Sequence, residues 1–127
     1  MRLIIVCDQL SAMRRLCGEL SNFRAEIICA ANQVELKAAC ESLFELALID
    51  VALADLVECI RTIRESAYGA NCPVLVASER LASGTGLAGM LPKLRVMPCV
   101  YNDLVKLARW LITGGQGEER RRNLRPL

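Results

Sequence analysis

Short continuous apolar runs alternate along the chain with segments in which apolar residues recur every three or four positions. The two clearest runs lie at residues 2–7 and 46–51. Asp8 directly follows the first run, and Asp50 lies near the end of the second. Continuous apolar runs of this length are typical of strands buried on both faces of a parallel sheet. Three further runs predict strands at residues 25–30, 74–77 and 94–97.

The segments between the runs each carry one apolar stripe, which predicts amphipathic helices. We expect these helices over residues 11–22, 32–43, 54–64 and 102–113. Asn32 and Glu35 are spaced as a capping box for the second helix, and Asn102 is the expected cap of the last one. Three glycines within residues 79–92 predict a short or irregular helix of low local stability there.

Alternation of five strands with helices predicts an α/β fold, a doubly wound parallel sheet with helices on both faces. The common strand order for five such units is 2-1-3-4-5, and ligands bind in the crevice between the first and third strands. Those are the two strands that lead into Asp8 and Asp50. We therefore expect the two carboxylates side by side at the carboxyl edge of the sheet.

The length of 127 residues suits one domain with its own core, which we place at residues 1–113. Residues 114–127 are polar and hold four arginines, which predicts a disordered tail or a linker. The net charge of +2 is too small to indicate nucleic-acid binding. Apolar runs fall well short of the ~20 residues of a membrane span. Because a signal-peptide pattern is also lacking, we expect a cytoplasmic protein without a membrane partner.

Seven cysteines are scattered through the chain, and histidine is absent. Their spacing does not match a zinc motif, and their number is odd. This pattern fits a reducing cytosol, where cysteine serves as a small apolar residue of the core. Cys7 and Cys99 stand apart because both fall near predicted strand ends.

Residues 2–112 resemble a bacterial response-regulator receiver domain, the phosphoaccepting module of two-component signalling. The resemblance rests on the strand end Ile-Ile-Val-Cys-Asp at residues 4–8, Leu-Ile-Asp at 48–50, Pro-Val-Leu-Val-Ala-Ser at 73–78, and Pro98. It implies a flavodoxin-like fold in which Asp50 is the phosphoacceptor and Ser78 is the switch hydroxyl that binds the phosphoryl group. Asp8 and Asp50 would then hold magnesium, which prefers oxygen ligands.

Two departures from the receiver pattern indicate a degenerate site. The acidic pair of the family falls on Cys7 and Asp8, so a thiol replaces one carboxylate, and a neutral thiol is a poor magnesium ligand. The lysine that precedes the proline of the fifth strand falls on Met97, and no nearby residue obviously replaces it, although the sequence offers Lys93 and Arg95 as candidates. We therefore expect magnesium binding to be weak.

Three functions remain open on this basis. The first is a pseudo-receiver, a non-enzymatic module that acts by binding a sensor kinase, an output protein or a second copy through the fifth strand and last helix. The second is a phosphorylation-competent receiver that uses Asp50. The third is a flavodoxin-type small-molecule binder, which is disfavoured because residues 8–11 do not form a Ser/Thr/Gly-rich phosphate loop. Structural readings also stand: Asp50 as a helix cap, Asp8 as a turn or cap residue, and Ser78 as an ordinary loop residue.

Overall fold

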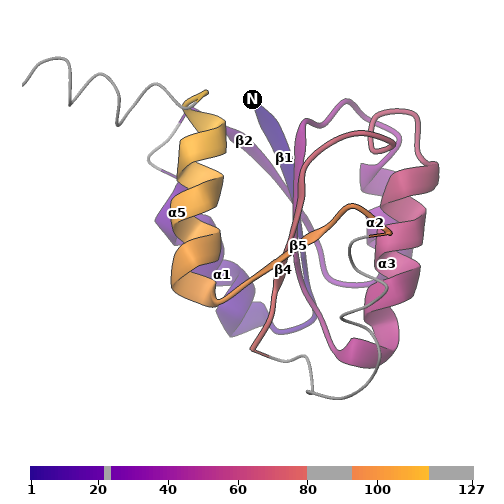
Figure 1. The fold of residues 1–127 in the computed structure, drawn as a ribbon, viewed down its shortest axis with the longest axis horizontal. Helices are drawn as coiled ribbons and strands as arrows, with labels where there is room; N and C mark the ends of the chain where they lie inside the picture. Colours follow the sequence, from indigo (N-terminus) through magenta and orange to yellow (C-terminus); the bar gives the residue numbers. More distant parts are fainter. Residues whose placement is uncertain (22–23, 80–92, 115–127) are drawn as a thin grey trace, which may run out of the picture.

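The chain folds around a five-stranded parallel sheet with the strand order β2-β1-β3-β4-β5 (Figure 1). A computed structural model describes residues 1–21, 24–79 and 93–114. The predicted fold class and strand order are therefore confirmed. The strands are β1 (Arg2–Cys7), β2 (Glu26–Ala30), β3 (Leu46–Asp50), β4 (Val74–Ala77) and β5 (Met97–Cys99).

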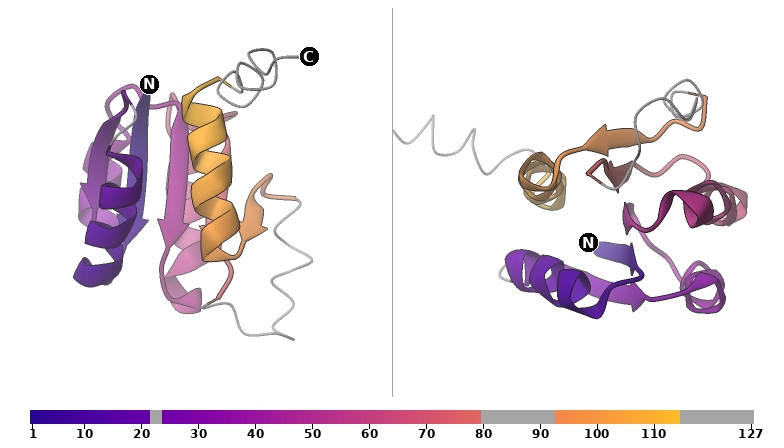
Figure 2. Two further views of the ribbon diagram at one scale, coloured as in Figure 1. Left: turned by 90° about the vertical axis from the view of Figure 1, so that its left-hand side faces the viewer. Right: turned by 90° about the horizontal axis from the view of Figure 1, so that it is seen from below.

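Helices cover both faces of the sheet (Figure 2). Two of them, α1 and α5, pack on one face, and α2 and α3 pack on the other. The described helices are α1 (Leu10–Leu20), α2 (Gln33–Ala39), α3 (Leu53–Glu65) and α5 (Tyr101–Ile112). None of these four is long and apolar enough to cross a membrane.

The central strands β1 and β3 are buried on both faces, which explains their continuous apolar sequences. Alternate residues of β1 enter different cores: Leu3 and Ile5 face α1 and α5, whereas Ile4 and Val6 face α2 and α3. The second core also holds Phe44, which is almost fully buried. These strands are therefore fixed by burial on both faces, and the residues that follow each strand lie at the carboxyl edge of the sheet.

The fifth strand begins three residues later than the sequence predicts, at Met97–Cys99 instead of 94–97. Residues 93–95 form a turn, and Arg95 adopts a positive φ of 57° there. Pro98, expected to end the strand, lies inside it. A proline is tolerated at this position because β5 is an edge strand, paired on one side only, with β4.

The helix bounds differ from the expectation by one to four residues, and two of these differences affect burial or capping. The second helix ends at Ala39, so Leu43 lies outside it and is 51% exposed. The last helix begins at Tyr101 after Val100, and no side chain caps it, so the predicted cap at Asn102 is wrong. The Asn32 half of the predicted capping box of α2 is confirmed, because the Asn32 side chain accepts a hydrogen bond from the Glu35 backbone N–H at 2.9 Å, whereas the Glu35 side chain accepts from the Ala31 N–H.

Some predictions fall on residues that the structure does not describe. The irregular helix within 79–92 lies almost wholly outside the described residues, and so does the tail at 114–127 apart from its first residue. Of the seven cysteines, five are buried as expected, but Cys17 is half-buried and Cys29 is exposed. The interpretation of every cysteine as a core residue is therefore wrong for Cys29.

Arg64, near the end of α3, ties two loops together. Its guanidinium donates hydrogen bonds to four backbone carbonyls: those of Leu94 at 3.2 Å, Gly69 at 2.8 Å, Cys72 at 2.7 Å and Arg95 at 2.6 Å. Two of these carbonyls belong to the loop before β4, and two belong to the turn before β5. One side chain therefore holds the entry points of both strands.

Replacing Arg64 with methionine should lower the free energy of unfolding by about 2 kcal/mol, because several carbonyls then lose their donor at once. Urea unfolding followed by circular dichroism measures this change. The matched control is Arg61→Met on the exposed side of the same helix, which should change the free energy by no more than about 0.5 kcal/mol. Equal effects at the two positions would contradict the role of Arg64.

Candidate functional site

The carboxyl ends of β1 and β3 bring Asp8 and Asp50 to one edge of the sheet. The parallel register pairs Cys7 with Asp50, and Asp8 directly follows Cys7. Asp50 is the last residue of β3 and is half-buried, whereas Asp8 is exposed. The two carboxylates therefore lie on neighbouring strands, as the sequence predicts.

Asp8 also connects two loops of this edge. Its Oδ2 accepts a hydrogen bond from the backbone N–H of Ala52 at 3.2 Å. Ala52 is the residue before α3, and it has no side-chain cap of its own. The predicted structural alternative for Asp8 was a turn or cap before the first helix; the contact observed instead is with the loop after β3. Because Oδ2 already accepts this backbone hydrogen bond, the Asp8 carboxylate is less available to a cation.

Cys7 occupies the place where the receiver resemblance implies a carboxylate. Its side chain is buried, with the residue only 1% exposed, and its Sγ lies 3.3 Å from the Gln9 carbonyl and 4.0 Å from Asp50 Oδ2. Over the described residues, the structure contains no group of three or more cysteine, aspartate or glutamate side chains that could hold a metal ion. A cation at this edge would therefore meet two carboxylates, and one of them already accepts a backbone N–H.

The sheet register defines a row of four side chains across this edge. Cys7 pairs with Asp50 and Ala77 pairs with Cys99, and Asp50 and Ala77 each follow the last pair of the β3–β4 ladder, Ile49 with Val76. Cys7, Ala77 and Cys99 all belong to the core beneath α1 and α5. In this row Asp50 therefore has the Cys7 thiol on one side and the Ala77 methyl group on the other, and the Cys99 thiol lies one strand further away.

Ser78 follows β4 at the same edge and is half-buried. Its backbone N–H donates a hydrogen bond to the Cys99 carbonyl at 2.8 Å, which joins the end of β4 to the end of β5. The three residues singled out in the sequence, Asp8, Asp50 and Ser78, therefore all lie at the carboxyl ends of β1, β3 and β4. The fold therefore brings together three residues that lie far apart in the sequence.

Met97 lies outside the row of Asp50. It pairs with Leu75, two residues before the pair formed by Ala77 and Cys99, and it is 52% exposed. Two residues of a strand span about 6.6 Å. The residue that directly precedes Pro98 is therefore not level with Asp50, and the residue of β5 in that row is Cys99.

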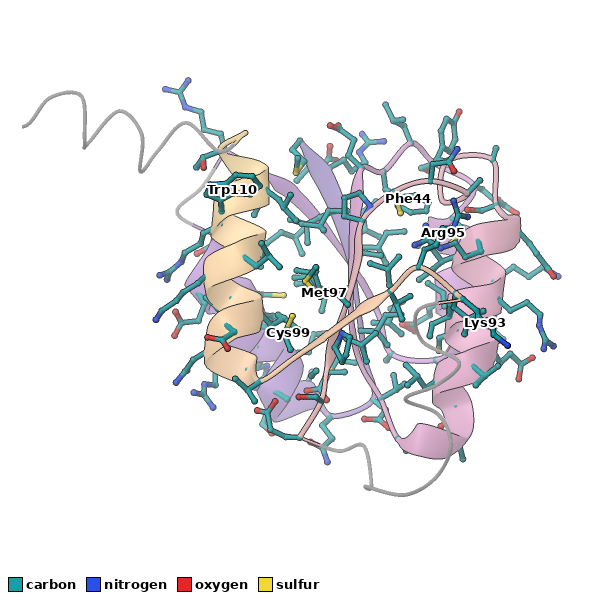
Figure 3. All side chains as sticks on the ribbon, viewed as in Figure 1. Phe44, Lys93, Arg95, Met97, Cys99 and Trp110 are labelled. Carbon is teal, nitrogen blue, oxygen red and sulfur yellow. The ribbon has the colours of Figure 1, made fainter. Side chains whose placement is uncertain are left out.

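Lys93 and Arg95, the two cations that the sequence offers in place of the receiver lysine, also lie away from Asp50 (Figure 3). Arg95 donates hydrogen bonds to the Asn71 side chain at 2.9 Å and to the Ala70 carbonyl at 2.5 Å, in the loop that leads into β4. That loop lies at the opposite end of the sheet from Asp50. Figure 3 shows Lys93 and Arg95 beside α3, whereas Cys99 lies between the sheet and α5.

Tyr101 at the start of α5 and Arg15 of α1 are in contact near this edge, and the sequence pattern marked neither of them. The Arg15 guanidinium lies 4.2 Å from the centre of the Tyr101 ring. Burial raises the pKa of Tyr101, and the charge of Asp50 contributes in the same direction. The Tyr101 hydroxyl is buried and has no hydrogen-bond partner among the described residues. No local pattern marks these residues, because the packing of α1 against α5 brings them together.

An open groove of about 800 Å³ runs between β5 and α5. Its apolar lining includes Met97, Val100 and Trp110, which are 52%, 50% and 46% exposed. Figure 3 shows Met97 in the space between β5 and α5, with Trp110 near the far end of that helix. Ser78 also lines the groove, so the groove begins at the edge that carries the aspartates.

Comparison of the sequence with protein-family models and with curated proteins finds no match. Comparison with solved structures finds similarity to a structure described as the adenylate cyclase from Rhodopirellula baltica. The TM-score is 0.61, the sequence identity is 16%, and the match covers 98% of each chain. A likeness at this identity concerns the fold, and it supports the flavodoxin-like α/β class found here.

Proposed function

We propose that this chain is a receiver-like domain of two-component signalling that works as a pseudo-receiver, by protein–protein contact. The proposal is supported by the 2-1-3-4-5 sheet and by the gathering of Asp8, Asp50 and Ser78 at one edge. The single observation that carries the pseudo-receiver part is the row around Asp50. Its neighbours in the row are Cys7 on one side and Ala77 on the other, with Cys99 one strand further away, and none of the three supplies the charge that phosphoryl chemistry needs.

The missing charges act on two steps of the chemistry. A carboxylate accepts a phosphoryl group efficiently when a cation neutralises the incoming oxygens. Asp8 and Asp50 would hold magnesium, and the buried Cys7 thiol adds no negative charge to that pair. A lysine bonded to the phosphorylated aspartate is worth about 1.5–3 kcal/mol, or roughly one to two decades in the switching equilibrium. The phosphorylated form of this domain should therefore differ little from the unmodified form.

The partner in this proposal is a protein, either a sensor kinase or an output protein. The groove between β5 and α5 is the surface that we assign to it, because three large apolar side chains are exposed there together. A second copy of the chain is the alternative occupant. We propose no enzymatic activity, and the name of the structural neighbour does not transfer at 16% identity.

A phosphorylation-competent receiver is the second candidate, and a specific observation favours it. Asp50 is half-buried at a strand end, with Asp8 on the neighbouring strand and Ser78 following the next one. These groups are sufficient for some phosphoryl transfer in principle. Asp50 is the phosphoacceptor in both candidates. They differ in how far phosphorylation changes the conformation of the domain.

Magnesium together with beryllium fluoride, a mimic of the phosphoryl group, distinguishes the two candidates. We expect the backbone amide chemical shifts of Ser78 and of residues 97–105 to stay close to those of the untreated protein. The Asp50→Asn variant is the control, and it should give the same spectrum with and without the additives. Large, saturable shifts at sub-millimolar magnesium that disappear in Asp50→Asn would contradict the pseudo-receiver and establish an ordinary receiver.

A further inference from the structure

Two cysteines from different elements place their sulfur atoms in contact. Cys17 lies on α1, Cys29 lies on the edge strand β2, and their Sγ atoms are 3.3 Å apart. Cys29 is level with Ile5 of β1, and alternation directs it towards the face that α1 covers. The contact therefore joins a helix to the strand that follows it in the chain.

These two cysteines differ from the other five in their access to solvent. Cys29 is exposed and Cys17 is half-buried, whereas Cys7, Cys40, Cys59, Cys72 and Cys99 are buried. A small oxidant can therefore reach Cys29 directly. Contact with a second sulfur and exposure of the first are two features that redox-active dithiols share.

We propose that Cys17 and Cys29 form a reversible intrachain disulfide when the protein meets a hydroperoxide such as hydrogen peroxide. The sulfurs approach from 3.3 Å to the ~2.0 Å of a disulfide bond, a movement that small changes of the two side-chain torsions supply. This inference is independent of the proposed signalling function, because it rests on the α1–β2 contact alone.

The chemistry has two steps. In the first, the Cys29 sulfur attacks one peroxide oxygen; the O–O bond breaks, an S–O bond forms, and one water leaves, so that Cys29 becomes a sulfenic acid. In the second, the Cys17 sulfur attacks the Cys29 sulfur; the S–O bond breaks, the S–S bond forms, and the second water leaves. Both thiol protons end in water, the two sulfurs are oxidised, and the peroxide is reduced. A small dithiol reverses the reaction by exchange.

The surroundings of the two cysteines determine which of them reacts with the oxidant first. Burial and the neighbouring Cys29 raise the pKa of Cys17 to about 12, so Cys17 is almost never a free thiolate near neutral pH. The exposed Cys29 is therefore the residue that meets the oxidant first. Once Cys29 is a sulfenic acid, its thiol no longer contributes to the raised pKa of Cys17, and Cys17 reacts as the resolving thiol, held at contact distance by its helix.

Peptide mapping of the wild-type protein tests the disulfide directly. Trypsin cleaves after Arg15, Arg24 and Lys37, so Cys17 and Cys29 fall in adjacent peptides, residues 16–24 and 25–37, with one cysteine each. After brief treatment with hydrogen peroxide and alkylation of free thiols, these two peptides should appear linked, with the loss of two hydrogens. This link should exceed any other cysteine pair by about tenfold or more, and dithiothreitol should remove it.

Matched variants and conditions decide the outcome. In Cys17→Ser, Cys29 should accumulate as a sulfenic acid that dimedone traps; in Cys29→Ser, oxidation of Cys17 should fall sharply. Oxidation in strong urea should spread links over all seven cysteines, which shows that folding selects the pair. Irreversible oxidation of Cys29 without the link, or a link between Cys29 residues of two chains, would overturn the proposal. Because the main readout uses the unmodified chain, it does not depend on a variant that folds.

Discussion

Gly69→Ala should lower the free energy of unfolding by about 3 kcal/mol or more, the largest loss that we expect from one added methyl group in this protein. A Cβ at this position would lie 2.0 Å from the Ile63 carbonyl oxygen and 2.6 Å from Ser66 Oγ. Neither atom can move away freely. The Ile63 carbonyl accepts hydrogen bonds from the backbone N–H and the hydroxyl of Ser66, and Arg64 holds the Gly69 carbonyl at 2.8 Å.

Gly18→Ala is the matched control for this prediction. Gly18 lies inside α1, and an added Cβ would meet no atom within 4 Å. Alanine has the higher helix propensity, so this variant should be more stable than the wild type by about 0.5–1 kcal/mol. Urea unfolding of both variants measures the difference. A Gly69→Ala protein as stable as the wild type would show that the loop after α3 can shift away from the helix.

The sequence predicted the central strands well because burial on both faces leaves a continuous apolar run. The predicted β4 matches residue for residue, and the strands that lead into Asp8 and Asp50 are where the pattern placed them. The edge strand β5 was misplaced because it has three residues, of which Met97 and Pro98 are exposed, so burial leaves no apolar run there. An exposed edge also allows a proline inside a strand.

The candidate site was predictable as far as it depends on strand ends. Asp8 and Asp50 come together because parallel strands finish at the same edge. The residue of β5 that lies in the row of Asp50 was not predictable. The register of this edge strand decides that it is Cys99 and not Met97. Contacts between whole elements leave no local pattern in the sequence, so the stacking of Arg15 on Tyr101 could not be foreseen.

Restoring a carboxylate at Cys7 should convert this edge into a magnesium site. We expect Cys7→Asp to bind magnesium at least about tenfold more tightly than the wild type, because the new side chain joins Asp8 and Asp50 as a third charged donor. The register places position 7 level with Asp50, and the Cys7 sulfur already lies 4.0 Å from its Oδ2. Isothermal titration calorimetry measures the affinity, and the shift of Tm with magnesium reports the same binding.

Stability provides a second readout of the same variant. Without magnesium, a carboxylate in a position that is 1% exposed and next to Asp50 is destabilising, so Tm should fall below that of the wild type. Magnesium should then recover most of the loss, which makes folding itself dependent on the metal. A variant that folds only in the presence of magnesium would support the prediction as directly as a titration does.

Two controls separate charge from shape in this experiment. Cys7→Asn has the size of the aspartate variant without its charge, so it should bind magnesium no more tightly than the wild type. Cys7→Asp combined with Asp50→Asn removes the neighbouring donor and should return the affinity to the wild-type range. If Cys7→Asp gained no affinity while remaining folded, the thiol could not be what weakens the site. The cause would then lie in the contact that already engages Asp8 with the Ala52 N–H at 3.2 Å.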